Sequence, residues 1–280
     1  MAKKKTLSNP DSAEREYTRL LTRFVRELRA DVNAALIPAI PGIVYQFDAE
    51  MRADGWTDAI ARVMAELLSL ATIKTTRIID RLPGMYALIN RHNERQFGMV
   101  VRANTGLTVP EARLLNGPGA FNAMAPVRNA LGVNIFRGEP YLAPLYEGWI
   151  AENTKLVRSI PEQYHSGLED TLRRGIMGGD SPRDLTRKIR ERFGVTERRA
   201  KLIAVDQTLS AHAELTRYRA QSVGVKEYTW ETVNDSRVRP EHAEREGKVF
   251  SWDKPPPDGH PGQPIRCRCS AGLIFPDDDE

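Results

Sequence analysis

The chain has two cysteines, Cys267 and Cys269, which stand two positions apart in the Pro/Gly-rich segment GHPGQPIRCRCSAG, close behind His260. Residues two positions apart on a β-strand point to the same face, so an extended segment would present both sulfur atoms together. With His242 and His260 they make two thiolates and two imidazoles, the ligand set of a closed tetrahedral zinc site. The sequence therefore predicts that His242, His260, Cys267 and Cys269 hold a structural zinc ion that staples a small domain.

The same residues also allow an interpretation without metal. Free cysteines often serve as small buried hydrophobic residues, and the histidines would then be surface or hydrogen-bonded groups. A disulfide between positions this close would form a strained ring, so we do not expect one. Metal ligation and simple burial are thus the two alternatives for the cysteine pair.

A second group that could do chemistry precedes the cysteines and consists of Asp235, Arg237 and His242. A carboxylate and an imidazole can act as a general acid–base pair or serve a metal-dependent nuclease. They can also form a network of hydrogen bonds and ion pairs that fixes a loop between strands. Because no nucleophile, phosphate loop or substrate pocket is recognisable nearby, we favour the network, predict no catalytic residue and do not expect an enzyme.

These residues need a scaffold, and the sequence indicates a small sheet after Gly224. The segments KEYTWETV and KVFSW are short, aromatic and β-branched, with turns between them, which predicts antiparallel strands. The segment IRCRC is the candidate for a third strand. We therefore expect a small C-terminal α+β domain with a short antiparallel sheet that zinc could staple.

The rest of the chain is predicted to be mainly α-helical. Apolar residues recur at helical spacing in DSAEREYTRLLTRFVRELRADV and in TDAIARVMAELLSLATIKTTRIIDRL. Glycine and proline recur between these helices and the next ones, where no period persists. We predict four regions: helices in 1–106, an irregular linker in 107–148, helices in 149–224 and the small α+β part in 225–280.

Helix boundaries in the third region are marked by capping residues. Ser181, followed by a proline and by Asp184, predicts the start of a helix, because a hydroxyl caps the first turn and a carboxylate stabilises it. We expect Gly194 to end this helix and Thr196 to cap another, which runs to about Gly224. The region would then be a set of short packed helices.

The composition is that of an ordinary globular protein with a net charge of +4. The longest apolar runs, such as AALIPAIPGIV, are broken by proline and are shorter than the roughly 20 residues that a membrane-spanning helix needs. No secretory signal is recognisable, so we expect the protein to stay in the cytosol in which it is made. Basic residues gather between Arg173 and Lys201, which fits either a non-specific contact to DNA phosphates or a solvated helix face, since acidic residues are interspersed.

Four runs of the sequence resemble one protein family. They are WIAENTKLVRSIPEQY, GVTERRAKLIAVDQ, GVKEYTWETVNDSRVRPEHAEREGKVFSW and PIRCRC, and they extend from about Trp149 to Gly272. Their order resembles the phage Mu F-like minor head proteins, the head morphogenesis family of tailed phages and prophages. Two segments depart from the family pattern: VDQTLS stands in place of an arginine-threonine-glutamate stretch, and GHPGQPI is one of several variants of the approach to the cysteines.

The resemblance implies a minor capsid protein, present in few copies, that is associated with the portal and aids head assembly and DNA packaging or ejection. The implied partners are the portal protein and the major capsid or scaffold proteins, with packaged double-stranded DNA as a non-specific contact and no membrane. The implied place is the inside of the virion head near the portal vertex, after assembly in the host cytoplasm. Two alternatives stay open: a metal-dependent nuclease or toxin-like enzyme that uses Asp235 and His242, and an assembly helper absent from the virion.

Overall fold

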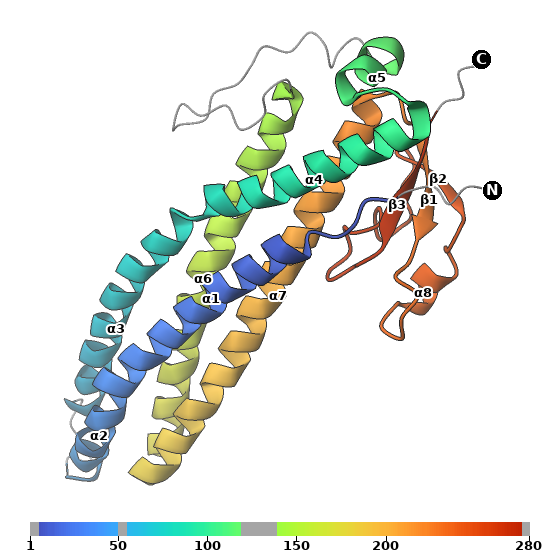
Figure 1. Ribbon diagram of the computed structural model, residues 1–280. Coiled ribbons are helices and arrows are strands. Elements are labelled where there is room, and N and C mark those ends of the chain that lie inside the picture. Colours follow the sequence, from blue (N-terminus) through green and yellow to red (C-terminus); the bar gives the residue numbers. More distant parts are fainter. Residues whose placement is uncertain (1–5, 50–54, 119–138, 276–280) are drawn as a thin grey trace. The chain divides into compact units, whose positions relative to one another are not determined.

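The computed structural model describes residues 6–49, 55–118 and 139–275, and it is mainly helical with a three-stranded sheet near the C-terminus (Figure 1). The helices described are α1 (Asp11–Asp31), α2 (Ile37–Ala49), α3 (Gly55–Ile79), α4 (Leu82–Thr105), α5 (Val109–Asn116), α6 (Ala143–Met177), α7 (Pro182–Ser222) and α8 (Pro240–Ala243), with a π-helical turn (Val32–Leu36) between α1 and α2 and a 3₁₀ turn (Pro140–Leu142) before α6. The strands are β1 (Glu227–Glu231), β2 (Val249–Ser251) and β3 (Ser270–Ile274). The predicted fold class is confirmed.

The chain divides into two compact units, each assembled from segments far apart in the sequence. The unit that contains the strands, called the sheet unit below, comprises Met1–Arg15, Pro83–Ala151 and Val205–Glu280. The other, called the helical unit, comprises Glu16–Leu82 and Glu152–Ala204. The boundaries between the units fall inside α1, α6 and α7, where the helical periodicity continues without a break.

The helical unit has an apolar core that follows from its sequence pattern. On α1, Leu21, Phe24 and Leu28 are almost fully buried, at the spacing of an amphipathic helix. A buried polar pair lies among them, where the hydroxyl of Tyr17 donates to Oδ1 of Asn153 over 2.8 Å. Within the part of the chain that the structure describes, no helix has the length and apolar content needed to cross a bilayer.

The turn between α6 and α7 follows the predicted capping signals. Gly179 adopts a φ of +78°, a left-handed conformation that favours glycine and ends α6. The backbone N–H of Asp184 donates to Oγ of Ser181 over 3.2 Å, and the Ser181 hydroxyl donates to the Asp184 carboxylate over 2.7 Å. Ser181 therefore caps α7 as predicted.

The predicted helix end at Gly194 is wrong, because α7 runs without interruption from Pro182 to Ser222. Thr196 does not cap a new helix there. Its hydroxyl donates to the carbonyl of Arg192, one turn earlier, over 3.2 Å, which is compatible with a continuing helix. The helix ends where predicted, before Gly224, which has a φ of +81°.

The region predicted as an irregular linker, 107–148, contains helix at both of its described ends. The first is α5, which begins after Thr108, whose backbone N–H donates to the carboxylate of Glu111 over 2.7 Å in a capping box. At the other end α6 already begins at Ala143. Residues 119–138, the middle of the predicted linker, lie outside the described residues.

The sheet has the strand order β2-β1-β3 and is antiparallel throughout. The central strand, β1, pairs Tyr228 with Phe250 of β2 and with Leu273 of β3. Tyr228 and Trp230 are fully buried on one face of β1, which is the period-two alternation expected of a half-buried strand. The two strands predicted from KEYTWETV and KVFSW are thus confirmed.

The third strand begins at Ser270, so the prediction that IRCRC forms it is wrong. Arg266 has a φ of +57°, and the backbone N–H of Cys267 donates to the carbonyl of Pro264 over 2.8 Å. Such a turn cannot continue as an extended strand. Cys269 is the residue directly before β3, and the two cysteines are positioned by this turn and by the start of the strand.

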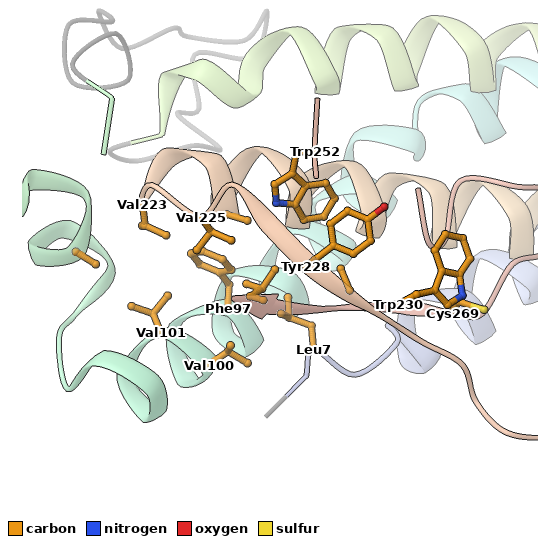
Figure 2. Close-up of a cluster of buried hydrophobic side chains, with 14 of the residues drawn as sticks. Leu7, Phe97, Val100, Val101, Val223, Val225, Tyr228, Trp230, Trp252 and Cys269 are labelled. Atoms are coloured by element: carbon orange, nitrogen blue, oxygen red, sulfur yellow. The ribbon is translucent and has the colours of Figure 1, made fainter. Parts of the chain in front are cut away.

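One face of the sheet packs on a hydrophobic core that distant segments of the sheet unit complete (Figure 2). The N-terminal segment contributes Leu7, α4 contributes Phe97 and Val100, and Val223 follows α7. The sheet contributes Tyr228, Trp230, Trp252, Ala271 and Leu273, together with Cys267 and Cys269. The predicted small domain is therefore part of a larger core, and burial as well as any metal can hold its strands together.

Candidate metal centre

The structure brings together three of the four predicted metal ligands. His242, Cys267 and Cys269 are all buried, and one nitrogen of the imidazole and the two sulfurs all lie within 4.8 Å of one another. Nδ1 of His242 is 3.5 Å from the sulfur of Cys267 and 3.5 Å from that of Cys269. The imidazole therefore faces both sulfurs through the same nitrogen atom.

His242 is held in this position by its helix and by an aromatic neighbour. It lies on α8, a single turn that starts with Pro240, whose fixed φ suits the first position of a helix. The ring of Trp230, on the central strand, meets the His242 ring edge to face with 5.0 Å between centroids. The loop that carries His242 is thus fixed against the same strand that supports the cysteines.

The other nitrogen of His242 is occupied by a carboxylate that the sequence reasoning missed. Nε2 of His242 lies 2.8 Å from Oδ2 of Asp258, and the second oxygen of Asp258 accepts from the Arg245 guanidinium over 2.6 Å. Although burial acts to raise the pKa of Asp258, the hydrogen bonds from His242 and Arg245 hold it below its ordinary value. An ionised Asp258 fixes the proton of His242 on Nε2 and leaves the lone pair of Nδ1 directed at the sulfurs.

The two thiols influence each other's ionisation. A hydrogen bond from Cys269 lowers the pKa of Cys267, with help from the backbone N–H of Gly262, which donates to the Cys267 sulfur over 3.4 Å. The same bond raises the pKa of Cys269. Cys267 is therefore the thiol that loses its proton first, and thiolate is the form of cysteine that binds metals.

His260, the fourth predicted ligand, is not part of the group. It lies in a turn between Gly259 and Gly262, which have φ values of +100° and +87°, and this turn directs its ring toward the aromatic core. Nδ1 of His260 is 2.9 Å from the Tyr228 hydroxyl, and its ring lies 5.0 Å from that of Trp252. The group that the structure brings together is therefore His242, Cys267 and Cys269, without His260.

Asp235, the other residue singled out in the sequence, takes part in an ion-pair network. Both of its oxygens accept from Arg268 at 2.7 Å, and Arg237 donates to it through its backbone and its side chain. The Arg268 hydrogen bonds lower the pKa of Asp235 to about 2. The carboxylate paired with His242 is Asp258, and the only hint of it in the sequence is an acidic residue in the turn-rich segment PPPDGHPG.

A pocket of about 400 Å³ opens beside the three clustered residues, all of which line it. Four arginines also line it, namely Arg237, Arg239, Arg266 and Arg268. Glu14, from the N-terminal segment, is the one acidic residue in the lining, and burial raises its pKa. The wall of the pocket is therefore rich in positive charge and suits an anion.

Two other histidines, His212 and His165, lie apart from this group. His212 is fully buried on α7, and its Nδ1 accepts from the side-chain amide of Asn93 over 3.2 Å. Burial lowers the pKa of His212 to about 3 and that of His165, in the helical unit, to about 4. Neither belongs to a cluster that could hold a metal within the described residues.

Comparison with known proteins finds a family model that matches part of the chain. Residues 166–272 match a family model described as "Phage Mu protein F like protein", which confirms the resemblance seen in the sequence. A protein of Haemophilus influenzae described as uncharacterized is 34% identical over 147 residues, which are 51% of this chain and 33% of the relative. The chain thus spans about a third of that relative's length. No solved structure matches the chain.

Proposed function

We propose that this protein is a minor capsid protein of a tailed phage or prophage that acts in head morphogenesis, in association with the portal and the inner head. The observation that carries the proposal is the Phage Mu F-like match over residues 166–272. That range includes α7, β1, β2, and the three residues of the candidate metal centre. Portal association, and a part in DNA packaging or ejection, are what the family resemblance implies for this chain.

The construction of the sheet unit supports a role as a structural component. Its core joins the matched region to residues outside it, since Leu7 and Phe97 lie in the same buried cluster as Trp230. The N-terminal segment is therefore fixed to the family region by burial of apolar surface. A particle component must keep its shape under crowding, and a core shared by distant segments resists local opening.

The basic stretch of α6 and α7 supports only a limited contact with packaged DNA. Half of the ten basic residues from Arg173 to Lys201 are in ion pairs with nearby acidic residues: Arg173 with Glu169, Arg174 with Asp170, Arg187 with Asp184 and Glu191, Lys188 with Asp180, and Lys201 with Glu197. Paired arginines displace fewer counterions when they meet a phosphate. We expect the logarithm of the affinity for random duplex DNA to fall with the logarithm of salt at a slope no steeper than about −5, since each phosphate contributes about −0.9.

The composition of mature particles tests the proposal. Mass spectrometry of purified virions is expected to find the chain in few copies relative to the major capsid protein. A reconstruction of the head without imposed icosahedral symmetry is expected to show its density at the portal vertex. If the chain is required for assembly but absent from the finished particle, the assembly-helper alternative replaces the proposal.

The proposed role needs no catalysis. The alternative of an acid–base pair between Asp235 and His242 has little support, since two arginines bind the Asp235 carboxylate and His242 pairs with Asp258. We expect the purified protein to leave duplex and single-stranded DNA intact with Mg²⁺, Mn²⁺ or Zn²⁺ added. Cleavage that disappears in Asp235→Asn but survives in the surface control Arg187→Gln would instead establish the enzyme alternative.

A further inference from the structure

We propose that His242, Cys267 and Cys269 bind one zinc ion through three protein ligands, and that the fourth coordination position opens into the arginine-lined pocket, where it takes an oxyanion. This inference rests on the geometry of the centre and not on the proposed role in the phage head. It differs from the closed four-ligand site that the sequence predicts, because His260 is excluded.

The distances within the group fit a tetrahedral zinc ion. Zinc binds sulfur at about 2.3 Å and imidazole nitrogen at about 2.0 Å, so a nitrogen and a sulfur on one ion lie about 3.6 Å apart. Nδ1 of His242 is 3.5 Å from the sulfur of Cys267 and 3.5 Å from that of Cys269. Both nitrogen–sulfur distances thus match the spacing that a bound ion would impose, and the two sulfurs lie within 4.8 Å of each other.

A second and independent observation is the hydrogen bond behind the histidine. Histidines that bind metal usually donate their other ring N–H to a carboxylate, which fixes the tautomer and orients the ring. Nε2 of His242 lies 2.8 Å from Asp258, and Arg245 holds the second oxygen of that carboxylate at 2.6 Å. Asp258 is therefore the positioning residue of the centre.

The fourth position follows from what surrounds the three donors. His260 is committed to Tyr228, with 2.9 Å between Nδ1 and the hydroxyl oxygen. Within the described residues, no other histidine, cysteine or carboxylate joins the group. All three residues line the pocket of about 400 Å³, and this is the side from which we expect a ligand in solution to approach the ion. Zinc sites that bind exchangeable ligands have this arrangement, with three protein ligands and one accessible coordination position.

The lining of the pocket defines the chemistry of that ligand. Zn²⁺ with two thiolates carries no net charge, so the attraction for an anion must come from the protein. Arg239 and Arg266 line the pocket together with Arg237 and Arg268. Arg237 and Arg268 are shared with Asp235, whereas Arg239 uses one nitrogen for the carbonyl of Ile265 and keeps further N–H donors. An oxyanion of the phosphate type, which guanidinium groups bind in a bidentate way, fits this lining.

The first experiment measures metal in the full-length chain purified without chelator. About one zinc per chain is expected in the wild type, as in other sites with one set of ligands. His242→Gln is expected to lose it, and the matched variant His260→Gln is expected to keep it. Asp258→Asn, which alters a partly exposed side chain and so should fold, is expected to bind zinc about 10–100-fold more weakly in competition with a chelating dye.

The second experiment replaces zinc by Co²⁺ and adds inorganic phosphate. The visible spectrum should show tetrahedral cobalt with thiolate charge-transfer bands, and phosphate should shift it in a saturable way. Arg239→Gln should weaken the phosphate effect without changing the cobalt stoichiometry. An oligonucleotide is then tested as a competitor of phosphate. Competition would show that a phosphate group at a strand end or on the DNA backbone can enter the site, and no competition would show that the site takes only free oxyanions.

Three results would overturn the inference. Wild-type protein without bound metal, after incubation with zinc, would remove the centre altogether. Loss of zinc in His260→Gln as severe as in His242→Gln would restore the closed four-ligand site. A cobalt spectrum that does not respond to phosphate at any concentration would show that the fourth position is closed.

Discussion

The two units of this protein differ in where their charged side chains are paired, on the surface or in the interior. In the helical unit the ion pairs lie mostly on the surface between residues three or four apart, such as Arg187 with Asp184 and Glu191. In the sheet unit Arg219 is only 1% exposed and binds Glu139 at 2.6 Å. Every residue with a positive φ in the described parts of the chain lies in the sheet unit, except Gly179.

This difference shows which unit depends more on contacts between residues that are distant in the sequence. A helix with an apolar stripe satisfies its backbone locally, so its polar side chains can point to water. In the sheet unit, by contrast, buried polar groups find partners that are distant in the sequence, such as Arg219 of α7 with Asn90 and Asn93 of α4. The sheet unit should therefore respond to single substitutions more strongly than the helical unit.

Replacement of Arg219 should produce the largest effect. Arg219→Leu leaves the buried carboxylate of Glu139 without its main partner, and loss of one member of a buried pair costs about 3–5 kcal/mol. Arg187→Leu, in exposed pairs of the helical unit, should change the free energy of unfolding by less than about 1 kcal/mol. Urea denaturation of both variants checks this contrast, and equal losses would refute it.

Removal of the proposed metal should affect the sheet unit and spare the helical one. With zinc at about 100 times its dissociation constant, binding stabilises the fold by about 2.7 kcal/mol, so a chelator should lower the free energy of unfolding by about that amount. Hydrogen exchange should show that protection is lost around β1 and α8 and kept in α3. Cys267→Ser should already be insensitive to the chelator, and a wild-type protein equally insensitive would contradict the prediction.

The two buried histidines allow a comparison by pH, since His212 lies in the sheet unit and His165 in the helical unit. Burial lowers the pKa of His212 to about 3 and that of His165 to about 4, both below the unfolded value of about 6.5. The unfolded chain thus binds more protons between these values, and stability is complete above about pH 6.5 and falls as the pH decreases toward 4 and then 3. Each histidine should contribute at most about 1.4 kcal/mol per pH unit.

Denaturation curves at pH 7 and pH 5 test this dependence. His165→Phe should remove part of the slope with little loss at pH 7, because Nδ1 of His165 is buried and has no hydrogen-bond partner among the described residues. His212→Leu should also reduce the slope but should cost stability at pH 7, because it removes the acceptor for Asn93. A slope unchanged in the double variant would assign the acid sensitivity to other titratable groups.

A pair of glycines gives the smallest expected effects, with opposite signs. Gly194 lies inside α7, and an added Cβ would have only a normal contact with Arg198, at 3.5 Å. Gly194→Ala should therefore stabilise the helix by about 0.5–1 kcal/mol. Gly262 has a φ of +87°, and a Cβ there would lie 2.7 Å from that of Ala213. Gly262→Ala should destabilise by more than about 1 kcal/mol, and thermal melts of the two variants compare the signs.

The helices were largely predictable because their signals are local. The stripe of Leu21, Phe24 and Leu28 and the cap at Ser181 each depend on residues within a few positions, and the structure confirms them. Gly194 failed as a signal because a helix buried along one side tolerates a glycine when its flanking turns are well packed. Propensity at one residue is smaller than the packing free energy of a helix of 41 residues.

The candidate metal centre was only partly predictable, for a different reason. The type and spacing of Cys267 and Cys269 pointed to a shared ligand group, and the structure places both sulfurs near His242. His260 was the predicted fourth ligand, whereas Asp258 is the residue that lies beside His242. The backbone turns at Gly259 and Gly262 decide the direction of each of these side chains. No pattern of residue types encodes such directions, so the sequence could not separate a ligand from a core residue.

The core that joins Leu7 to the sheet also constrains how the chain folds during synthesis. The side-chain amide of Asn9 donates to the carbonyl of Arg268, 259 positions later, over 3.3 Å. Contacts between residues this distant form slowly, because a long loop must close before they contribute. The N-terminal segment and α4 therefore cannot complete their packing, and Phe97 and Val100 stay exposed, until the ribosome has synthesised the strands. This interval is the time at which a chaperone, or an assembling partner, could bind the apolar surface that the finished fold conceals.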